Sequence, residues 1–277
     1  MVLCDTLEVS RAGYYAWLAE SVTANQQRDR ELMPLVCDIF WQHKRRYGAR
    51  RIAVELAARG QPCGVDRVAK LLKMQGLRAI QPQSYKPRTT NSRHTLGYSP
   101  NLLLRSSPPA QLNRVWVADI TYLPLKTGGF AYLASLMDLC SRRVVGWSVD
   151  AQMTDSLVID ALQKAIALRQ PPPSLVHHSD RGGQYASHDY RAILRRADCK
   201  QSMSRAANCY DNAFKESCFG TIKTELEMTE YDHCHAARAE IASYLAYYNT
   251  ERRHSSLDYL SPTAFEAQLA LQPNHSP

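Results

Sequence analysis

The spacing of apolar residues changes twice along the chain, and the first stretch is helical. Apolar positions recur every three to four residues at about 29–43, 48–59 and 66–75, and the run Gly60–Gly64 separates the last two segments. Two short helices around a tight turn indicate a helix-turn-helix. The pattern therefore predicts an N-terminal helical module over residues 1–80.

Residues 81–111 follow without periodicity. Prolines at 82, 87, 100, 108 and 109 are interspersed with Ser, Thr and Arg, which predicts a basic linker or an extended arm. Its basic side chains either follow a phosphate backbone or are simply solvated.

From residue 112 the pattern is that of an α/β domain. Strand-like runs are expected at 115–125, 130–139, 143–150, 174–179 and 199–204, and helices at 155–169, 187–197 and 212–226. This order predicts a mixed five-stranded sheet flanked by helices over residues 112–226. The remaining segment, 227–277, is expected to be helical and basic, with helices at about 235–249 and after Ser261-Pro262.

Charge is concentrated in the helical part of the chain. The 277 residues carry a formal net charge of +8, whereas residues 41–95 alone carry thirteen basic and two acidic residues, a net of +11. A polyanion such as DNA is the expected partner; a solvated basic face on a packing module is the alternative. The candidate DNA contacts are Arg45, Arg46, Arg50, Arg51, Arg67 and Lys70, with Arg252, Arg253 and His254 in the tail.

The cysteines and the N-terminal sequence indicate the cellular compartment of the protein. The eight cysteines form no Cys-x-x-Cys pair, which is typical of reduced thiols in a cytosolic protein. No run approaches the ~20 apolar residues of a membrane-spanning helix, and the first residues lack a secretion signal. We expect a cytoplasmic, nucleoid-associated protein.

Three acidic residues are the strongest candidates for chemistry. Asp119 lies in a strand-like run, Asp180 ends an apolar run before a glycine turn, and Glu216 lies in a helical run. Two strand ends and one helix can bring three carboxylates together, and such a site binds hard divalent cations. Paired cations catalyse in-line phosphoryl displacement. Taken singly, each residue also fits a structural role: a satisfied strand residue, a turn and a solvated helix face.

Helical periodicity also predicts a lysine side chain at this site. Glu216 and Lys223 are seven residues apart, which places them on the same side of the predicted helix, opposite its apolar stripe. A carboxylate for a metal and a lysine for a phosphate fit that arrangement.

The residues around these positions resemble a known family. The motifs include Trp116-x-x-Asp119-Ile-Thr-Tyr122, His178-Ser-Asp-Arg-Gly-Gly-Gln-Tyr185, Asp211-Asn-Ala-Phe-Lys-Glu-Ser217 and Tyr247-Tyr-Asn-x-x-Arg-Arg-His254. They are similar to the second open reading frame (OrfB) of two-frame bacterial insertion sequences. That product is a DDE transposase with a catalytic core like that of retroviral integrases, and the resemblance extends over nearly the whole chain.

The resemblance implies a ribonuclease H-like fold for about 112–226. It implies that Asp119, Asp180 and Glu216 are catalytic ligands of two Mg²⁺ or Mn²⁺ ions, and that Lys223 contacts the DNA end of the element. The implied partners are DNA, further copies of the chain on DNA, and an upstream-frame product with a helix-turn-helix and leucine zipper, joined by frameshift.

The expected function is thus metal-dependent DNA cleavage and strand transfer. A metal-dependent nuclease on the same core is the first alternative, and it differs by hydrolysing DNA without joining strands. A DNA-binding regulator without catalysis is the second, and it would tolerate loss of the three acids.

Overall fold

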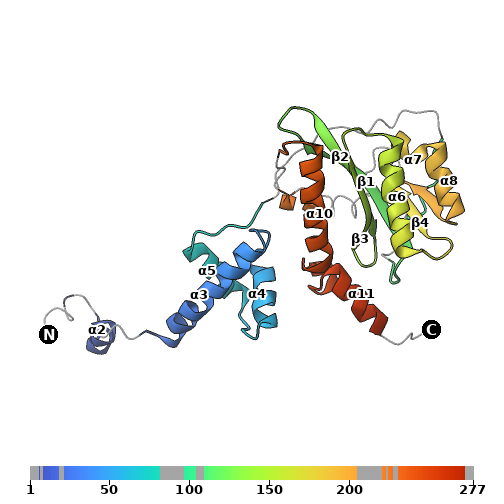
Figure 1. Cartoon of the computed structure of the whole chain (residues 1–277). Coiled ribbons are helices and arrows are strands. Elements are labelled where there is room, and N and C mark those ends of the chain that lie inside the picture. The colour runs from blue at the N-terminus through green and yellow to red at the C-terminus, as the bar shows by residue number, and fades with distance from the viewer. Residues whose placement is uncertain are drawn as a thin grey trace. The chain divides into compact units, whose positions relative to one another are not determined.

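The computed structural model describes residues 6, 9–18, 22–81, 97–103, 109–204, 220–222, 224–226 and 230–271. The chain forms two compact units, Met1–Ile80 and Gln81–Pro277, which are drawn in Figure 1. Among the described helices, none has the length and apolar character that crossing a membrane requires.

Three helices form the core of the first unit. They are α3 (Ala24–Gln42), α4 (Ala49–Ala58) and α5 (Val65–Met74), and they confirm the three helices expected from periodicity. Their shared apolar core contains Leu32, Val36, Ile39, Phe40, Tyr47, Ile52, Leu56, Val68 and Leu71. A shorter helix, α2 (Arg11–Leu18), was not predicted.

The first of these helices begins five residues earlier than periodicity indicated, because its start is set by polar caps. Gln26 N donates to Thr23 Oγ1 at 3.2 Å, and Thr23 N donates to Gln26 Oε1 at 2.8 Å. This reciprocal capping box satisfies two amide groups that a helix N-terminus otherwise leaves without partners.

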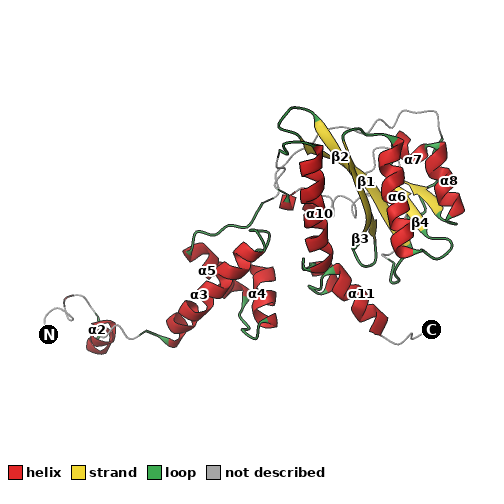
Figure 2. Ribbon diagram, in the orientation of Figure 1, coloured by secondary structure: helices red, strands yellow, loops and turns green. Residues whose placement is uncertain are grey.

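The second unit is built on one five-stranded sheet (Figure 2). Its strands are β1 (Val115–Pro124), β2 (Phe130–Asp138), β3 (Val144–Asp150), β4 (Val176–Ser179) and β5 (Lys200–Met203). Their order is β3-β2-β1-β4-β5. The first three pair antiparallel, while β4 pairs parallel with both β1 and β5. The predicted fold class, a mixed five-stranded sheet flanked by helices, is confirmed.

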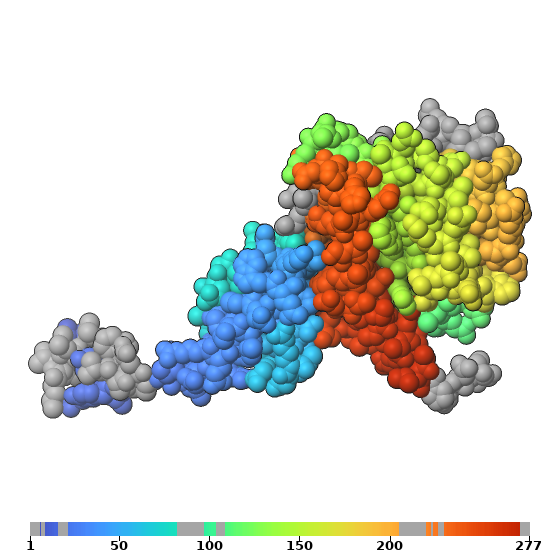
Figure 3. Space-filling model, viewed as in Figure 1, coloured from blue at the N-terminus to red at the C-terminus, as the bar shows by residue number. Residues whose placement is uncertain are grey.

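Helices cover both faces of this sheet. On one face α6 (Asp155–Arg169), α7 (Gly183–Ala186) and α8 (His188–Arg196) pack on a core that includes Trp116 and Ala118. On the other, α10 (Cys234–Thr250) packs on Val115, Val117 and Leu123. The sheet lies between α10 and α6 in Figure 1, and the atoms of these two helices cover much of the visible face of this unit in Figure 3. The strand predicted at 115–125 is therefore confirmed, and its successive side chains alternate between the two cores.

Close contact between β3 and α6 depends on a glycine. A Cβ added to Gly146 would lie 2.3 Å from the backbone oxygen of Ala161 and 2.6 Å from Ala165 Cβ. No side chain fits at that distance, so Gly146 allows the helix to lie directly on the strand.

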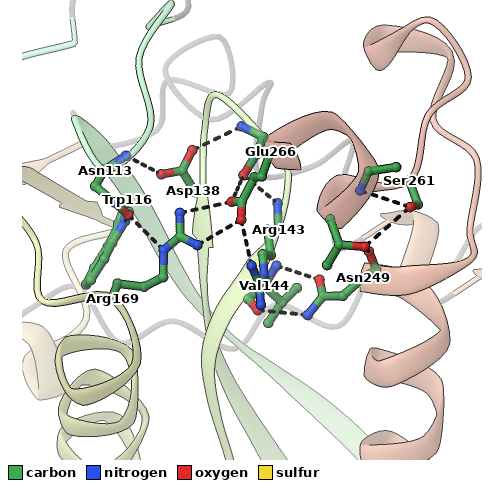
Figure 4. Close-up of polar contacts among 12 residues, drawn as sticks. Asn113, Trp116, Asp138, Arg143, Val144, Arg169, Asn249, Ser261 and Glu266 are labelled. Carbon is green, nitrogen blue, oxygen red and sulfur yellow. Dashed lines mark hydrogen bonds and ion pairs between the residues drawn. The ribbon is translucent and has the colours of Figure 1, made fainter. Parts of the chain in front are cut away.

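The last helix, α11 (Pro262–Leu271), is fixed to the sheet by a carboxylate (Figure 4). Glu266 accepts hydrogen bonds from Arg143 at 2.6 Å, from Arg169 at 2.8 and 2.9 Å, and from Ser141 at 2.8 Å. Burial would raise the pKa of Glu266, but the hydrogen bonds and charge of these partners outweigh it and lower that pKa.

Two more polar side chains hold the same end of the sheet (Figure 4). Asp138 is fully buried and accepts from the backbone amides of Asn113, Cys140 and Ser141. Asn249, on α10, accepts from Val144 N at 2.9 Å and donates to Val144 O at 3.0 Å. Asp138 and the motif residue Asn249 thus organise the fold.

Residues 97–103 lie along the outer strand β5, although they belong to the segment predicted as a linker. Met203 N donates to Pro100 O at 3.4 Å, and Leu102 N donates to Ser202 Oγ at 2.9 Å. Arg191 Nη2 donates to Gly97 O at 2.8 Å. This part of the linker is consequently attached to the second unit.

Candidate active site

Asp119 lies in the middle of the central strand β1, among apolar neighbours. Its side chain is half-buried, and Ser135 of β2 stands directly opposite it in the antiparallel ladder. Burying a carboxylate in such a setting costs free energy unless positive charge or hydrogen bonds compensate.

Asp180 follows directly after the parallel strand β4. Its Oδ1 accepts a hydrogen bond from Gly182 N at 2.9 Å, which closes a tight turn. A Cβ on Gly182 would lie 3.0 Å from that oxygen and 3.2 Å from Gln184 Oε1. The glycine lets the turn close on the carboxylate, as the glycine-rich sequence after Asp180 indicated.

The register of β1 and β4 brings the two carboxylates together. Val115 pairs with Val176, Trp116 with His177 and Val117 with His178. Continuing this register two residues beyond the last pair places Asp119 beside Asp180, the residue that directly follows β4. Carboxyl ends of parallel strands are where α/β sheets place ligands.

The environment of Tyr185 supports this convergence. Its side chain is buried, and burial raises the pKa of its hydroxyl well above 10. The charges of Tyr190, Asp119 and Asp180 raise it further. Both carboxylates therefore lie close enough to the Tyr185 hydroxyl to raise its pKa, although one lies on β1 and the other follows β4.

Buried hydroxyls line the positions next to Asp119. Thr121 is two residues further along the same face of β1, and Ser135 is the cross-strand neighbour. Within the described part of the chain, the side-chain oxygens of Thr121, Ser135 and Tyr185 have no hydrogen-bond partner. Sequence reasoning did not single out these hydroxyls, but Thr121 and Tyr185 lie in the quoted motifs at fixed spacing from the two acids.

The turn after Asp180 is held from outside by Arg181. Its Nε donates to Ser204 O at 2.8 Å, and its guanidinium lies 4.6 Å from the ring centroid of Tyr98. Residues 97–103 thus contribute a side chain next to the site.

The histidines before Asp180 are part of the interior. His177 Nε2 lies 2.7 Å from the hydroxyl of Tyr190, and His178 Nδ1 lies 2.8 Å from Ser202 Oγ. Both rings are buried, so these hydrogen bonds attach β4 to α8 and to β5.

The third predicted carboxylate, Glu216, and the predicted DNA contact Lys223 lie outside the residues that the structure describes. Among those it does describe, no group of three or more His, Cys, Asp or Glu residues is positioned to hold a metal ion. Their roles stay predictions.

The basic residues of the first unit lie on or near its surface. Arg45 and Arg50 are exposed, whereas Arg46 and Arg51 are half-buried. The guanidinium of Arg51 lies 5.5 Å from the ring centroid of Tyr47. Arg50 and Arg51 belong to the first turn of α4, where backbone amides favour an anion.

Arg67 and Lys70 connect two helices while remaining accessible. Arg67 Nε lies 3.3 Å from Asp29 Oδ1, and Lys70 Nζ lies 2.8 Å from Asp29 Oδ2. The hydrogen bond from Lys70 lowers the pKa of the Asp29 carboxyl. The side chain of Lys70 is 63% exposed, so the ion pair leaves it accessible to solvent.

The structure contradicts two of the three DNA contacts predicted in the C-terminal tail. Arg252 and His254 were predicted to contact DNA, but they are only 3% and 8% exposed. Arg252 forms a buried ion pair with Glu225 at 2.6 Å. Arg253 is half-buried and donates to Tyr259 O at 3.1 Å. The prediction that Arg252 and His254 contact DNA rested on their charge alone. It is wrong because tertiary packing buries both side chains.

Models of known protein families match segments of both units. A model described as "Integrase core domain" matches residues 109–209, a second model of that description matches 197–262, and an "HTH-like domain" matches 27–85. The insertion element IS600 31 kDa protein of Shigella sonnei is 40% identical over 95% of this chain and 97% of its own length. Transposase InsF for insertion sequence IS3A of Escherichia coli (strain K12) is 40% identical over 95% of this chain and 92% of its own.

The chain belongs to the IS3 family of insertion-sequence transposases. The predicted family and the integrase core are thereby confirmed. Among solved structures, the HTLV-2 integrase catalytic core domain in complex with magnesium matches this transposase with a TM-score of 0.42 and 18% identity, over 55% of this chain and 95% of that one.

Proposed function

We propose that this transposase cleaves DNA at the ends of its insertion sequence and joins those ends to target DNA. Asp119, Asp180 and Glu216 are its catalytic residues. The observation that supports the proposal is the parallel register of β1 and β4, which, if continued for two residues, brings Asp119 beside Asp180. Two adjacent carboxylates repel each other unless cations neutralise them.

The side chains around Asp119 and Asp180 are suited to bind a hard divalent cation. Carboxylate oxygens are the ligands that Mg²⁺ and Mn²⁺ prefer, and the buried oxygens of Thr121, Ser135 and Tyr185 offer further hydrogen bonds to a hydrated site. Two such ions, when bound, would activate the attacking oxygen and stabilise the leaving oxygen of the phosphodiester.

The side chains have separate tasks in this reaction. Asp119, on a rigid central strand, fixes the position of the site, and Asp180 is oriented by the amide of Gly182. Glu216 completes the carboxylate set, and Lys223 holds a phosphate of the element end. No protein nucleophile is required, because water and then a DNA 3′-hydroxyl attack the phosphorus.

DNA is held mainly by the first unit in this proposal. Arg45, Arg46, Arg50 and Arg51 lie at or just before the start of α4, and Arg67 and Lys70 lie on α5. Its match to an HTH-like domain supports this role. The further proposed partners are additional copies of the chain on DNA and an upstream-frame product carrying a helix-turn-helix and leucine zipper, fused by frameshift or associated.

A strand-joining assay tests the reaction. Wild-type protein and the variants Asp119→Asn, Asp180→Asn and Glu216→Gln are incubated with element-end DNA, target DNA and Mg²⁺. Losing several kcal/mol of transition-state stabilisation should slow joining by at least about 10²-fold for each variant. Asp189→Asn removes an exposed acid from the first turn of α8 and should join at the wild-type rate.

The products separate the alternatives. Hydrolysis without joining by the wild type would favour a nuclease, and DNA binding with neither product would favour a regulator. Undiminished joining by Glu216→Gln would remove Glu216 from the site.

A further inference from the structure

The helical residues 220–222 and 224–225 lie next to an ion pair inside the protein. Glu225 and Arg252 have side chains that are 6% and 4% exposed. Arg252 Nε lies 2.9 Å from Oε1 and 2.8 Å from Oε2 of Glu225, and Arg252 Nη2 lies 2.6 Å from Oε1. The guanidinium thus holds both oxygens of one carboxylate, which fixes its orientation as well as its distance.

Aromatic side chains enclose this pair. The hydroxyl of Tyr244 donates to Glu225 Oε2 at 3.1 Å, and the guanidinium lies 5.5 Å from the ring centroid of Tyr248. Arg252 Nη1 lies 3.2 Å from a ring nitrogen of His254. Burial opposes the charge of Arg252, but the hydrogen bonds and charge of Glu225 outweigh it and raise the pKa of Arg252.

The position of Glu225 relates this network to the catalytic site. Glu225 comes nine residues after Glu216 and two after Lys223. At 100° per residue in the predicted helix, Glu225 points away from the side shared by Glu216 and Lys223. Ile222 and Leu226, in the described part of that helix, are buried in the same core as Ile241 and Leu245 of α10.

Apolar contacts and the ion pair constrain the helix differently. Apolar side chains hold a helix against its neighbour, but they are non-directional and allow small rotations. A buried ion pair adds little net stability relative to apolar residues, and its best-attested use is to specify one register. We infer that Glu225 and Arg252 form a positioning pair that sets the rotation of the helix predicted to carry Glu216 and Lys223. The inference rests on the proposed function of those two residues.

The test removes the network while keeping the volume. Glu225→Met, Tyr244→Phe and Arg252→Met are combined, because apolar replacement of a buried ion pair often preserves stability. The thermal midpoint should stay within a few degrees of the wild type. Joining at saturating DNA should slow by about 10-fold or more, because small misplacement of a catalytic group is costly. Mn²⁺ affinity, measured by electron paramagnetic resonance, should fall, because Glu216 is displaced.

The network around Glu266 provides a matched control. Glu266→Met with Arg143→Met and Arg169→Met removes a half-buried set of ion pairs that holds α11. Per folded molecule, this control should join DNA and bind Mn²⁺ as the wild type does. A purely stabilising role for Glu225 and Arg252 predicts the same behaviour for both triple variants, which would overturn the inference.

A conservative variant covers the case in which the triple variant does not fold. Arg252→Lys keeps the charge but cannot reproduce the planar grip on two oxygens, so the protein should fold with a more mobile helix. Amide hydrogen exchange in peptides spanning 220–226 should accelerate, and joining should slow by several-fold. Unchanged exchange and joining would overturn the positioning role, whereas absence of joining by the wild type would instead refute the proposed function.

Discussion

The two units use their basic residues in opposite ways. In the first unit Arg45 and Arg50 remain exposed, and the acids nearby are few. In the second, Arg252 is buried against Glu225, and Arg143 and Arg169 both bind Glu266. Arginines that look equivalent in the sequence are therefore left accessible for the proposed DNA contact in one unit and fix internal architecture in the other.

The largest effect should come from breaking the interior pair on one side. Arg252→Ala leaves Glu225 buried without its cation, and removing one partner of a buried pair costs about 3–5 kcal/mol. Denaturant unfolding followed by circular dichroism measures the loss. Arg50→Ala removes the same type of side chain from the surface of α4 and should change the free energy of unfolding by less than about 0.5 kcal/mol. Equal losses in the free energy of unfolding of the two variants would contradict the difference between buried and exposed arginines.

Acid should act on the second unit through Glu266. Because folding lowers the pKa of this carboxyl from its ordinary value of 4.5, its contribution to stability is present above that pH and is lost as pH falls through the folded value. Glu266→Gln should lower the free energy of unfolding at pH 7 by about 1–3 kcal/mol. It should also flatten the decline of that free energy as the pH falls below about 4.5.

Asp29→Asn is the comparison for this experiment. Asp29 also has a lowered pKa, but its partner Lys70 is largely exposed, so the ion pair is screened by solvent. The decline with acid should change less than in Glu266→Gln, and a larger change would contradict the assignment.

The smallest effect on stability should accompany a clear effect on binding. Arg45→Ala combined with Arg50→Ala should leave unfolding unchanged while weakening binding to any DNA sequence. The slope of log affinity against log salt should decrease by about 0.9 for each phosphate that the variant no longer neutralises. Fluorescence anisotropy with labelled duplexes at several salt concentrations measures it, and an unchanged slope would remove both residues from the DNA interface.

Local patterns were enough to predict most elements of the fold. The strand at 115–124 followed from alternation, and its two faces pack on different cores as expected. Short elements were missed: α7 has four residues, too few for a helical period to appear. The start of α3 was misplaced because a capping box, and not an apolar residue, sets it.

The candidate site was predictable only as far as local sequence motifs and the order of the strands determine it. Asp119 was chosen as an acid within an apolar strand and Asp180 as an acid at the end of an apolar run, and continuing the β1–β4 register brings the two side by side. The hydroxyl of Ser135 was missed because it comes from β2, which is paired with β1 in space but separate in the sequence. Arg252 was misread because Glu225 is 27 residues away in sequence, and nothing local indicates such a pairing.

The side-chain amide of Asn249 has a consequence for solubility. Strand β3 is an outer strand, and exposed strand edges invite pairing with the edge of another molecule. Asn249 occupies both the N–H and the C=O of Val144 on that edge, and residues 97–103 lie along the opposite outer strand, β5. Both outer strands of the sheet are thereby partly covered, which leaves less free edge for β-aggregation.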